Sequence, residues 1–239
     1  MGGWGKRWNG LEPTVVLGEW RGMCGRFSEL VDPMVLGDVL ALVDSLCTFT
    51  PRTTVAPSQR APVVVQAREG NVLKEMRWGL IPHWADDERI GAKLFNARCE
   101  TADQKPAFRE AWRQRRCLVP STGFYEWRRR ESAEGNGERA QPFHFQRPDR
   151  GLFCFAGLWE RWERPPARQG ELFADSFEAP PPMLETFTIL TQPPNALVGA
   201  YHDRMPVMLE PADGAAWLDR SDLTVADFVD QLLVDPVEI

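Results

Sequence analysis

Four polar side chains that could carry out chemistry lie far apart in this chain. They are Cys24 in "RGMCGRF", Asn96 in "LFNARCET", Glu126 in "GFYEWRRR" and His202 in "AYHDRMPVML". A cysteine offers a thiol nucleophile, a carboxylate and an imidazole can each move a proton, and an asparagine can only orient a ligand by hydrogen bonding. Each residue also has an ordinary interpretation: a buried thiol, a turn or capping asparagine, a solvated carboxylate and a hydrogen-bonded core histidine.

The surroundings of Glu126 bear on its use as an acid or base. Alternation along a strand would place Phe124, Glu126 and Arg128 on one face and Tyr125 and Trp127 on the other. A carboxylate beside aromatic side chains is either solvated at an edge or partly desolvated, and desolvation raises its pKa. In the second case Glu126 could give and take a proton near neutral pH.

Cys24 directly follows a methionine, Met23, and this suggests that it could become the first residue. The preceding residues 1–22 lack the apolar stretch of a secretory signal. We expect them to be an upstream extension of the reading frame or a removable leader. A terminal cysteine carries an amine and a thiol on adjacent carbons. Because an α-amine has a pKa near 7.7–8.0, against about 10.4 for lysine, its free-base fraction at neutral pH is larger by a factor on the order of a few hundred.

Charge is distributed unevenly along the chain, although the net charge is −6. Residues 93–130 contain ten lysines and arginines against four acidic residues, whereas residues 207–239 contain eight acidic residues and one arginine. This asymmetry is expected when one face meets phosphate and another keeps the molecule soluble. On charge alone, a solvated helix face with an acidic tail after it fits equally well.

The five cysteines are widely spaced and include no C-x-x-C pair, which argues against a disulfide framework and a zinc site. No apolar run is long enough to span a bilayer. We therefore expect a soluble protein of a reduced compartment, the bacterial cytosol or nucleoid, that acts as a monomer without a metal or cofactor.

Short strand patterns outnumber helical ones. Apolar alternation predicts strands over 61–68 and 71–78, joined by a turn at residues 69–71, and further strands over 116–120, 124–128, 142–147, 152–159 and 185–191. Polar segments rich in glycine or proline, 131–141 and 164–182, are predicted loops within the same domain.

Helical patterns are few. Residues 28–45 have roughly helical apolar spacing with Ser28 as a possible cap, although Pro33 confines a regular helix mostly to the residues after the proline. Other helices are expected over 106–114, 211–218 and 225–233. The prediction is an α+β fold: a single domain with a mainly antiparallel sheet or open barrel, flanked by a few helices.

Taken jointly, six segments resemble the SOS response-associated peptidase (SRAP) family. In chain order they are "MCGRF", "VAP", "RWGLIPHW", "FNARCET", "GFYEW" and "HDRMPVML". The resemblance extends from Met23 to about Trp217, and it implies an α+β domain over 23–239 with an acidic C-terminal tail. It also implies a function. The amino-terminal cysteine would crosslink to abasic sites in single-stranded DNA and shield them from strand breakage and error-prone bypass.

The resemblance also implies roles for individual residues. Cys24 would form the crosslink, and Asn96, Glu126 and His202 would complete the active site. Contacts to single-stranded DNA are expected from a second set: Arg26, Arg98, Thr54, Pro57, Trp78 and Trp84. Thr54 stands where the family usually has asparagine. The two tryptophans would stack on or wedge between bases, with core packing as the alternative.

Two other classes of function remain open at this point. An internal Cys24 could serve a thiol hydrolase or peptidase together with His202 and Asn96. Such an enzyme would not need a free terminus, and any peptide cleavage that we expect is self-processing that exposes Cys24. The basic segment alone would suffice for a non-covalent single-stranded DNA-binding module, in which Cys24 is incidental.

Overall fold

The computed structural model describes residues 25–131, 138–164, 183–219 and 235–238. Its centre is a five-stranded barrel, built from β4 (Arg60–Ala67), β5 (Gly70–Trp78), β7 (Arg116–Ser121), β10 (Phe153–Glu163) and β11 (Met183–Gln192). The strands follow the order β11-β10-β7-β4-β5 with antiparallel neighbours, and β5 then pairs with β11 in parallel. This last pairing closes the barrel.

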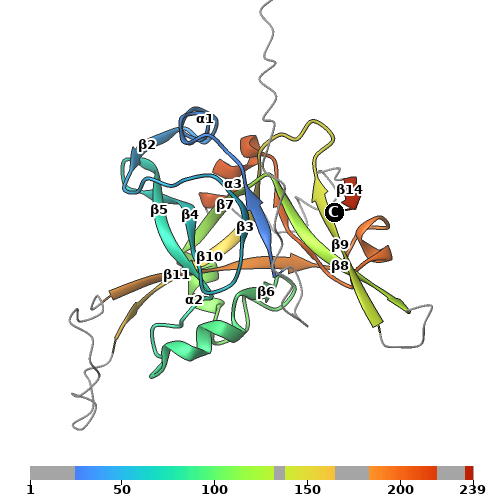
Figure 1. Ribbon diagram of the computed structural model, residues 1–239. Coiled ribbons are helices and arrows are strands. Elements are labelled where there is room, and N and C mark those ends of the chain that lie inside the picture. The colour runs from blue at the N-terminus through green and yellow to red at the C-terminus, as the bar shows by residue number, and fades with distance from the viewer. Residues whose placement is uncertain (1–24, 132–137, 165–182, 220–234, 239) are drawn as a thin grey trace, which may run out of the picture.

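A smaller sheet lies beside the barrel (Figure 1). Its order is β14-β9-β8-β1-β3, with β1 (Phe27–Glu29), β3 (Arg52–Val55), β8 (Gly123–Glu131), β9 (Glu138–Gln146) and β14 (Asp235–Glu238). All of its neighbouring strands are antiparallel. This sheet carries Glu126 and the first described residues of the chain.

Short strands extend the barrel at its edges. They are β2 (Leu42–Ser45) on β5, β6 (Asn96–Arg98) and β12 (Met205–Pro206) on β11, and β13 (Met208–Leu209) on β10. β6 runs parallel to β11, with Asn96 opposite Ile189, whereas β12 is antiparallel to β11. The segment that contains Asn96 therefore lies along the C-terminal part of β11.

The helices are short. Within the described residues, the α-helices are α1 (Pro33–Val39), α2 (Arg109–Gln114) and α3 (Gly214–Leu218), and the 3-10 turns are η1 (Glu88–Lys93), η2 (Val198–Ala200) and η3 (Pro211–Asp213). None of the helices among the described residues is long and apolar enough to cross a membrane.

The predicted α+β class, with a mostly antiparallel sheet and a few flanking helices, is confirmed, and the barrel is closed. The helix expected over 28–45 is partly wrong. Ser28 lies in β1, where its side chain is buried, and Asp32 caps α1 instead by accepting from the Met34 amide. The helix expected over 106–114 begins at Arg109.

The expected hairpin of β4 and β5 is present, but its turn is shorter than predicted because Ala67 pairs with Gly70. Residue 131 and residues 138–141, expected to be loop, belong to the paired strands β8 and β9. Most of the second predicted loop (164–182) and the helix expected over 225–233 lie outside the described residues.

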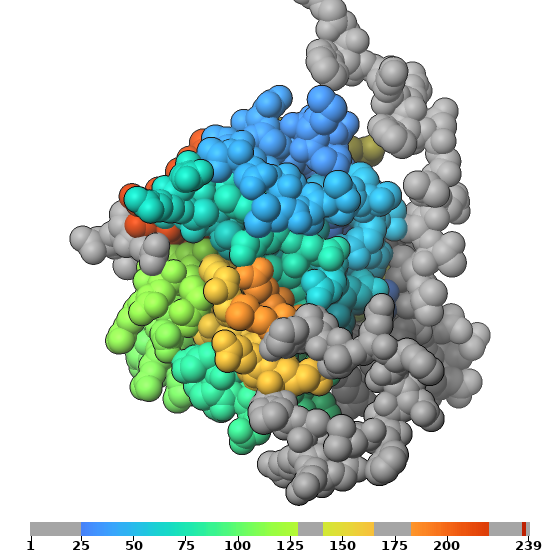
Figure 2. Space-filling view, turned by 90° about the vertical axis from the view of Figure 1, so that its left-hand side faces the viewer, coloured from blue at the N-terminus to red at the C-terminus, as the bar shows by residue number. Residues whose placement is uncertain are grey.

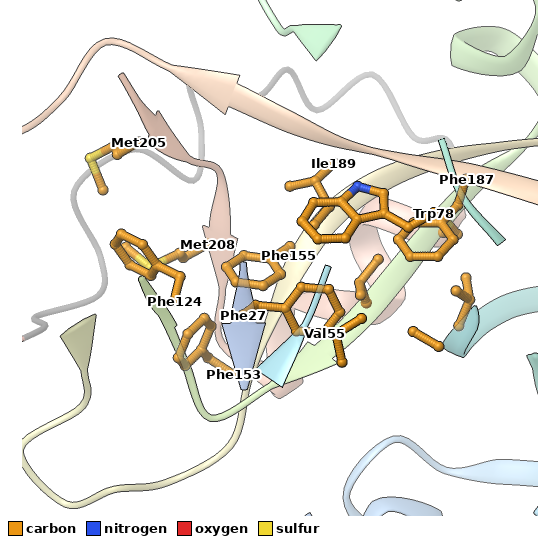
Figure 3. Packing of buried hydrophobic residues seen from close by; sticks show 14 of the residues in the cluster. Phe27, Val55, Trp78, Phe124, Phe153, Phe155, Phe187, Ile189, Met205 and Met208 are labelled. Atoms are coloured by element: carbon orange, nitrogen blue, oxygen red, sulfur yellow. The ribbon is translucent and has the colours of Figure 1, made fainter. Parts of the chain in front are cut away.

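An aromatic cluster joins the barrel to the smaller sheet (Figure 3). Trp78 and Phe187 stack with ring centroids 6.3 Å apart, and Phe27 meets Trp78 edge-on at 5.2 Å. From the smaller sheet, Phe124 approaches Phe155 of β10 at 6.4 Å. Fully burying one such side chain contributes about 1.5–3 kcal/mol, so this cluster is a principal reason why the two sheets stay together.

Candidate functional site

The pairing of β1 with β8 places the start of the described chain beside Glu126. Phe27 pairs with Phe124, and the Tyr125 amide donates to the carbonyl of Arg26 at 3.0 Å. Continuing this antiparallel register by two residues places Gly25 opposite Glu126. Cys24 itself lies outside the described residues. Gly25, to which it is bonded, is buried at this position.

Glu126 is a buried carboxylate in the smaller sheet. The residue is 2% exposed, and its cross-strand neighbour in β9 is Phe143, which is also buried. Of the two surroundings expected for Glu126, a solvated edge or partial desolvation, the structure has the buried one. A carboxyl group held in such a place is suited to exchanging protons with a bound molecule rather than with bulk water.

His202 is held beside the same sheet by its neighbour. Tyr201 packs edge-on against Phe143 and Phe145, with ring centroids at 4.7 and 5.2 Å. The His202 imidazole uses Nδ1 locally, because this atom lies 3.1 Å from the amide nitrogen of Arg204 and 2.9 Å from Oδ1 of Asp203. The His202 side chain is 25% exposed, so this histidine is partly buried but still reachable from solvent.

Asn96 begins β6, on the edge of β11. The carbonyl of the preceding residue, Phe95, accepts hydrogen bonds from the Ile189 amide at 3.1 Å and from the Trp78 indole at 2.8 Å. The Phe95 ring also contacts Trp78 edge-on at 6.0 Å, and Trp78 in turn contacts Phe27. The strand that carries Asn96 is thus fixed against the residues just after Cys24.

These contacts bring the four predicted segments to one aromatic cluster. Phe27 and Phe124 are buried members of it, and Phe95 and Tyr201 pack against it. Each lies within three residues of a predicted site residue, namely Cys24, Glu126, Asn96 or His202. The sequence separation of these segments, from residue 24 to residue 202, is therefore overcome by a single packed core.

An ion pair that the sequence analysis did not identify joins two of the segments. Both terminal nitrogens of Arg204 bind the Glu100 carboxylate, with Nη2 2.7 Å from Oε2, and Nη2 also donates to the Thr191 carbonyl at 2.7 Å. These hydrogen bonds from Arg204 are the main reason why the pKa of Glu100 is lowered to about 2. The pair links the segment after Asn96 to the segment after His202. Both residues stand in the quoted motifs, but nothing in the sequence indicates that they meet.

Another histidine in this region has a structural role. His144 stacks on Tyr125 with ring centroids 4.5 Å apart, and its Nε2 lies 2.9 Å from the Ser28 hydroxyl. Burial lowers the pKa of His144 to about 4, which keeps it neutral near pH 7. Gly123 makes room for it, because a Cβ atom at that position would lie 2.2 Å from this Nε2.

The described cysteines are poor candidates for a nucleophile. They are Cys47, Cys99, Cys117 and Cys154, and all four are free thiols. Burial raises the pKa of each, to about 12 for Cys99, where the neighbouring Glu100 adds to the effect. Because the thiolate is the reactive form, these side chains are held in their unreactive state. Within the described residues, no group of three or more His, Cys, Asp or Glu side chains could hold a metal ion.

The residues predicted to contact DNA do not all lie in one place. Arg98 is exposed, Thr54 and Pro57 are partly exposed, and the Arg26 guanidinium lies over the Trp127 ring at 5.7 Å. Trp78 is 1% exposed and belongs to the core. Its predicted stacking on bases is therefore wrong, because both faces of its ring are enclosed by protein.

Trp84 is 51% exposed and could stack on a base, but it belongs to a different part of the barrel. Its neighbour Ala85 packs with Ile81 and Trp162 in a separate cluster near Leu184, toward the opposite end of β11 from Ile189. Figure 2 shows the face on which the ends of β10 and β11, in yellow and orange, reach the surface below the blue residues of α1 and β2. The structure therefore does not group Trp84 with the other four segments.

The basic run over 93–130 also divides into two kinds of residue. Arg115 binds Glu160 at 2.8 Å and Glu110 at 3.2 Å. The guanidinium of Arg116 contacts two tryptophan rings, at 5.2 Å from the centroid of Trp112 and 4.4 Å from that of Trp217. These two side chains are used within the fold, so the cationic face is smaller than the sequence count suggests.

Comparison with known proteins agrees with this arrangement. The family model described as SOS response associated peptidase (SRAP) matches residues 23–238. The abasic site processing protein YoqW of Bacillus subtilis is 36% identical over 217 residues, which cover 88% of this chain and 86% of that protein. The abasic site processing protein YedK of Escherichia coli is 28% identical over 204 residues, or 82% and 79% of the two chains.

A solved structure has the same fold. The crystal structure of a protein from Bacteroides thetaiotaomicron superposes with a TM-score of 0.72 at 26% identity, over 90% of this chain and 92% of that one. Since the family model matches nearly the whole of the folded chain, and its motif segments meet at one aromatic cluster, the protein belongs to the SOS response associated peptidase (SRAP) family.

Proposed function

We propose that this protein shields abasic sites in single-stranded DNA by bonding to them covalently through Cys24. Membership of the SRAP family supports the proposal, as do relatives that are named abasic site processing proteins. The observation that supports it most directly is the pairing of β1 with β8. Continued by two residues, this register would bring the residue after Cys24 opposite a buried carboxylate, Glu126.

The proposed chemistry requires Cys24 to be the first residue. An abasic deoxyribose opens to an aldehyde. The terminal amine adds to its carbonyl carbon, and loss of one water molecule gives an imine. The Cys24 thiol then adds to the imine carbon and its proton passes to the nitrogen, which closes a five-membered thiazolidine ring. In sum, one aldehyde and one aminothiol give one thiazolidine and one water, and no oxidant or reductant takes part.

The neighbouring residues have roles that match the proton transfers in these steps. Opening the sugar ring and dehydrating the carbinolamine both require a proton to be moved to or from oxygen, which we assign to Glu126. His202 is the second acid or base, acting through Nε2 because Nδ1 serves the adjoining turn. Asn96 does not titrate, so we assign it to orienting the amine or the sugar by hydrogen bonds.

A free amine at Cys24 implies that the preceding residues are absent from the mature protein. We propose that residues 1–22 are an upstream extension or a removable leader and that Met23 is then lost. A self-processing cleavage that exposes Cys24 is the activity that would fit the peptidase in the family description. Under this proposal, a thiol hydrolase with an internal Cys24 is the competing mechanism, because it would not depend on the amine.

The proposed partner is single-stranded DNA, bound largely without regard to base sequence. Arg26 and Arg98 would contact phosphates. Thr54 in β3 and Pro57, two residues after β3, would border the same DNA strand. Affinity should then fall steeply as the salt concentration rises, because bound phosphates release their counterions.

Separating the amine from the thiol tests this mechanism. The protein is prepared with Cys24 as its first residue and mixed with a single-stranded oligonucleotide that contains one abasic site. The covalent product is measured on a denaturing gel. Acetylating the amine, or keeping one residue ahead of Cys24, should abolish the adduct although the thiol is intact. Cys24→Ser and Cys24→Ala keep the amine, so they should lose most of the stable adduct but form an imine that borohydride traps.

The amine-blocked protein is the decisive sample. If it crosslinked as fast as the protein with a free terminus, an ordinary thiol nucleophile would have to replace the thiazolidine mechanism. If no preparation formed a covalent product while all of them bound the oligonucleotide, the protein would be a non-covalent single-stranded DNA-binding module.

A further inference from the structure

Arg128 lies on the same strand as Glu126, two residues further along β8. Side chains two apart on a strand share a face and are about 7 Å apart, so Arg128 extends from the face on which Glu126 is buried. Unlike Glu126, Arg128 is exposed. Its cross-strand neighbour in β9 is the neutral residue Gln141. On β8, a buried carboxylate and an exposed cation therefore lie only two positions apart on the same face.

The guanidinium of Arg128 is supported by the ring of Tyr201. Its central carbon lies 5.7 Å from the ring centroid, and Tyr201 directly precedes His202. Tyr201 is itself fixed by its edge-on contacts with Phe143 and Phe145. Because Phe143 is the cross-strand neighbour of Glu126, the cation stands at the border between two of the four site segments.

This guanidinium is available to an anion, in contrast to several other arginines of the fold. Arg52, Arg115 and Arg204 form ion pairs with glutamates, whereas Arg128 forms no ion pair with a described residue. An arginine commonly stacks on an aromatic ring with the face of its guanidinium. Its N–H groups lie in the plane of the group, so they can still donate two parallel hydrogen bonds to a phosphate.

We propose that Arg128 binds a backbone phosphate of the nucleotide next to the abasic residue, with Tyr201 as its aromatic support. This inference rests on the proposed function and adds to it a residue of the DNA-binding surface. A phosphate is the expected ligand, and not a base, because a guanidinium can donate two parallel hydrogen bonds to phosphate oxygens, and the Tyr201 ring already contacts Arg128 and two phenylalanines.

Equilibrium binding of an unreactive DNA tests the proposal. The oligonucleotide is single-stranded and carries a tetrahydrofuran in place of the abasic sugar, which has no aldehyde and cannot crosslink. Arg128→Ala should lower its affinity about tenfold at low salt, since a charge-assisted bidentate contact is lost. The slope of log affinity against log salt should become shallower by about 0.7, the change expected for one phosphate of a single strand. Arg113→Ala is the matched control, because Arg113 is an exposed arginine on α2, and it should change neither quantity.

Neutralising single phosphates locates the contact. A series of oligonucleotides carries one methylphosphonate each, at successive positions around the tetrahydrofuran. A methylphosphonate at one position beside the tetrahydrofuran should weaken binding by the unsubstituted protein. The same methylphosphonate should leave binding by Arg128→Ala unchanged. Arg128→Lys keeps the charge without the planar fork, so it should retain the salt slope and lose part of the affinity. Tyr201→Leu should also lower the affinity for the oligonucleotide, and the loss should come from the contact with the same phosphate.

The outcomes distinguish this inference from the proposed function. If the unsubstituted protein binds the tetrahydrofuran oligonucleotide and crosslinks an abasic one, while Arg128→Ala matches Arg113→Ala in affinity and slope, Arg128 is not a phosphate ligand. If the unsubstituted protein neither binds nor crosslinks, the proposed function itself fails. A methylphosphonate effect that persists in Arg128→Ala at every position would equally overturn the assignment.

Discussion

Two buried glutamates lie in adjacent strands of the smaller sheet, and their surroundings differ. Glu29 of β1 is 0% exposed, and its Oε2 lies 3.2 Å from Nη2 of Arg52. Burial raises the pKa of Glu29 from 4.5 to about 7 even though Arg52 opposes the shift. Glu126 of β8 is 2% exposed and lies opposite Phe143, two residues along β8 from Phe124, which pairs with Phe27 of β1.

The comparison shows that a buried carboxylate near a cysteine does not by itself make a reactive site. Glu29 also has a cysteine within electrostatic range, Cys47. There the negative charges of Glu29 and Glu75 add to burial in raising the pKa of the Cys47 thiol. An internal cysteine in such a place is kept protonated. The start of β1, near Glu126 of β8, would differ because a terminal Cys24 there brings its own amine. The amine is the group that reacts first in the proposed mechanism.

Replacing each glutamate by glutamine should separate their roles most clearly in the crosslinking rate. Glu126→Gln keeps the shape but cannot carry a proton, so the rate of adduct formation should fall by about 10²–10⁴-fold at saturating DNA. Glu29→Gln should leave that rate within about twofold of the unsubstituted protein. Single-turnover gels under identical conditions provide the measurement.

Unequal folding could imitate this result, so the thermal unfolding of both variants needs to be recorded. Equal rates for the two variants, with both folded, would remove Glu126 from the mechanism. A slow Glu29→Gln variant would mean that the surroundings of Glu29 also affect the reaction at Cys24.

The pH dependence of stability should single out Glu29. Its folded pKa, about 7, is higher than its ordinary value of 4.5, so the folded protein binds this proton more tightly than the unfolded chain does. The contribution of Glu29 to the free energy of unfolding is therefore fully present below about pH 4.5. It falls between pH 4.5 and 7 and stays low above pH 7. The loss amounts to at most about 3 kcal/mol. Glu29→Gln can still accept a hydrogen bond from Arg52, and it should not show this loss.

Urea unfolding at several pH values between 5 and 8 measures the difference. The free energy of unfolding of the unsubstituted protein should decline relative to that of Glu29→Gln as the pH rises. Parallel curves would show that Glu29 remains ionised in the fold across this range, and the contrast with Glu126 would then rest on geometry alone.

Local patterns in the sequence predicted much of the fold. Alternating apolar residues located the strands of the barrel, and the hairpin of β4 and β5 is where the pattern placed it. The parallel pairing of β5 with β11, which closes the barrel, was not predictable, because it joins residues more than one hundred positions apart and leaves no local signal. Ser28 was misread as a helix cap, since its partner His144 is supplied by a distant strand.

The candidate site was recognisable only as a set of motifs, and the sequence could not say which motif residues face DNA. Trp78 and Trp84 stand in one motif, yet Trp78 is buried in edge-on contact with Phe27, and Trp84 is half exposed near a different cluster. Arg115 and Arg116 counted equally with Arg98 in the charge of the basic run. Each also binds a partner from a distant segment, Glu160 for Arg115 and Trp217 for Arg116, so their structural role could be seen only after folding.

A third glutamate, Glu100, completes the comparison and should give the smallest effect. It is the reverse of Glu29: Arg204 holds its pKa at about 2, so it remains ionised throughout the neutral range. Glu100 does not belong to the proposed reaction. Its expected role is to keep the Asn96 segment and the His202 segment in register through Arg204, which is 8% exposed and also donates to the Thr191 carbonyl.

Glu100→Gln should therefore slow crosslinking only about fivefold at saturating DNA, because one hydrogen bond to Arg204 can persist while the charge pairing is lost. Affinity for the tetrahydrofuran oligonucleotide should stay unchanged, since Glu100 is not a DNA ligand. Glu100→Asp, which restores the charge on a shorter side chain, should recover part of the rate. A loss of DNA affinity equal to the loss of rate would contradict the positioning role. It would mean that the Glu100–Arg204 pair shapes the binding surface itself and does not merely align Asn96 with His202.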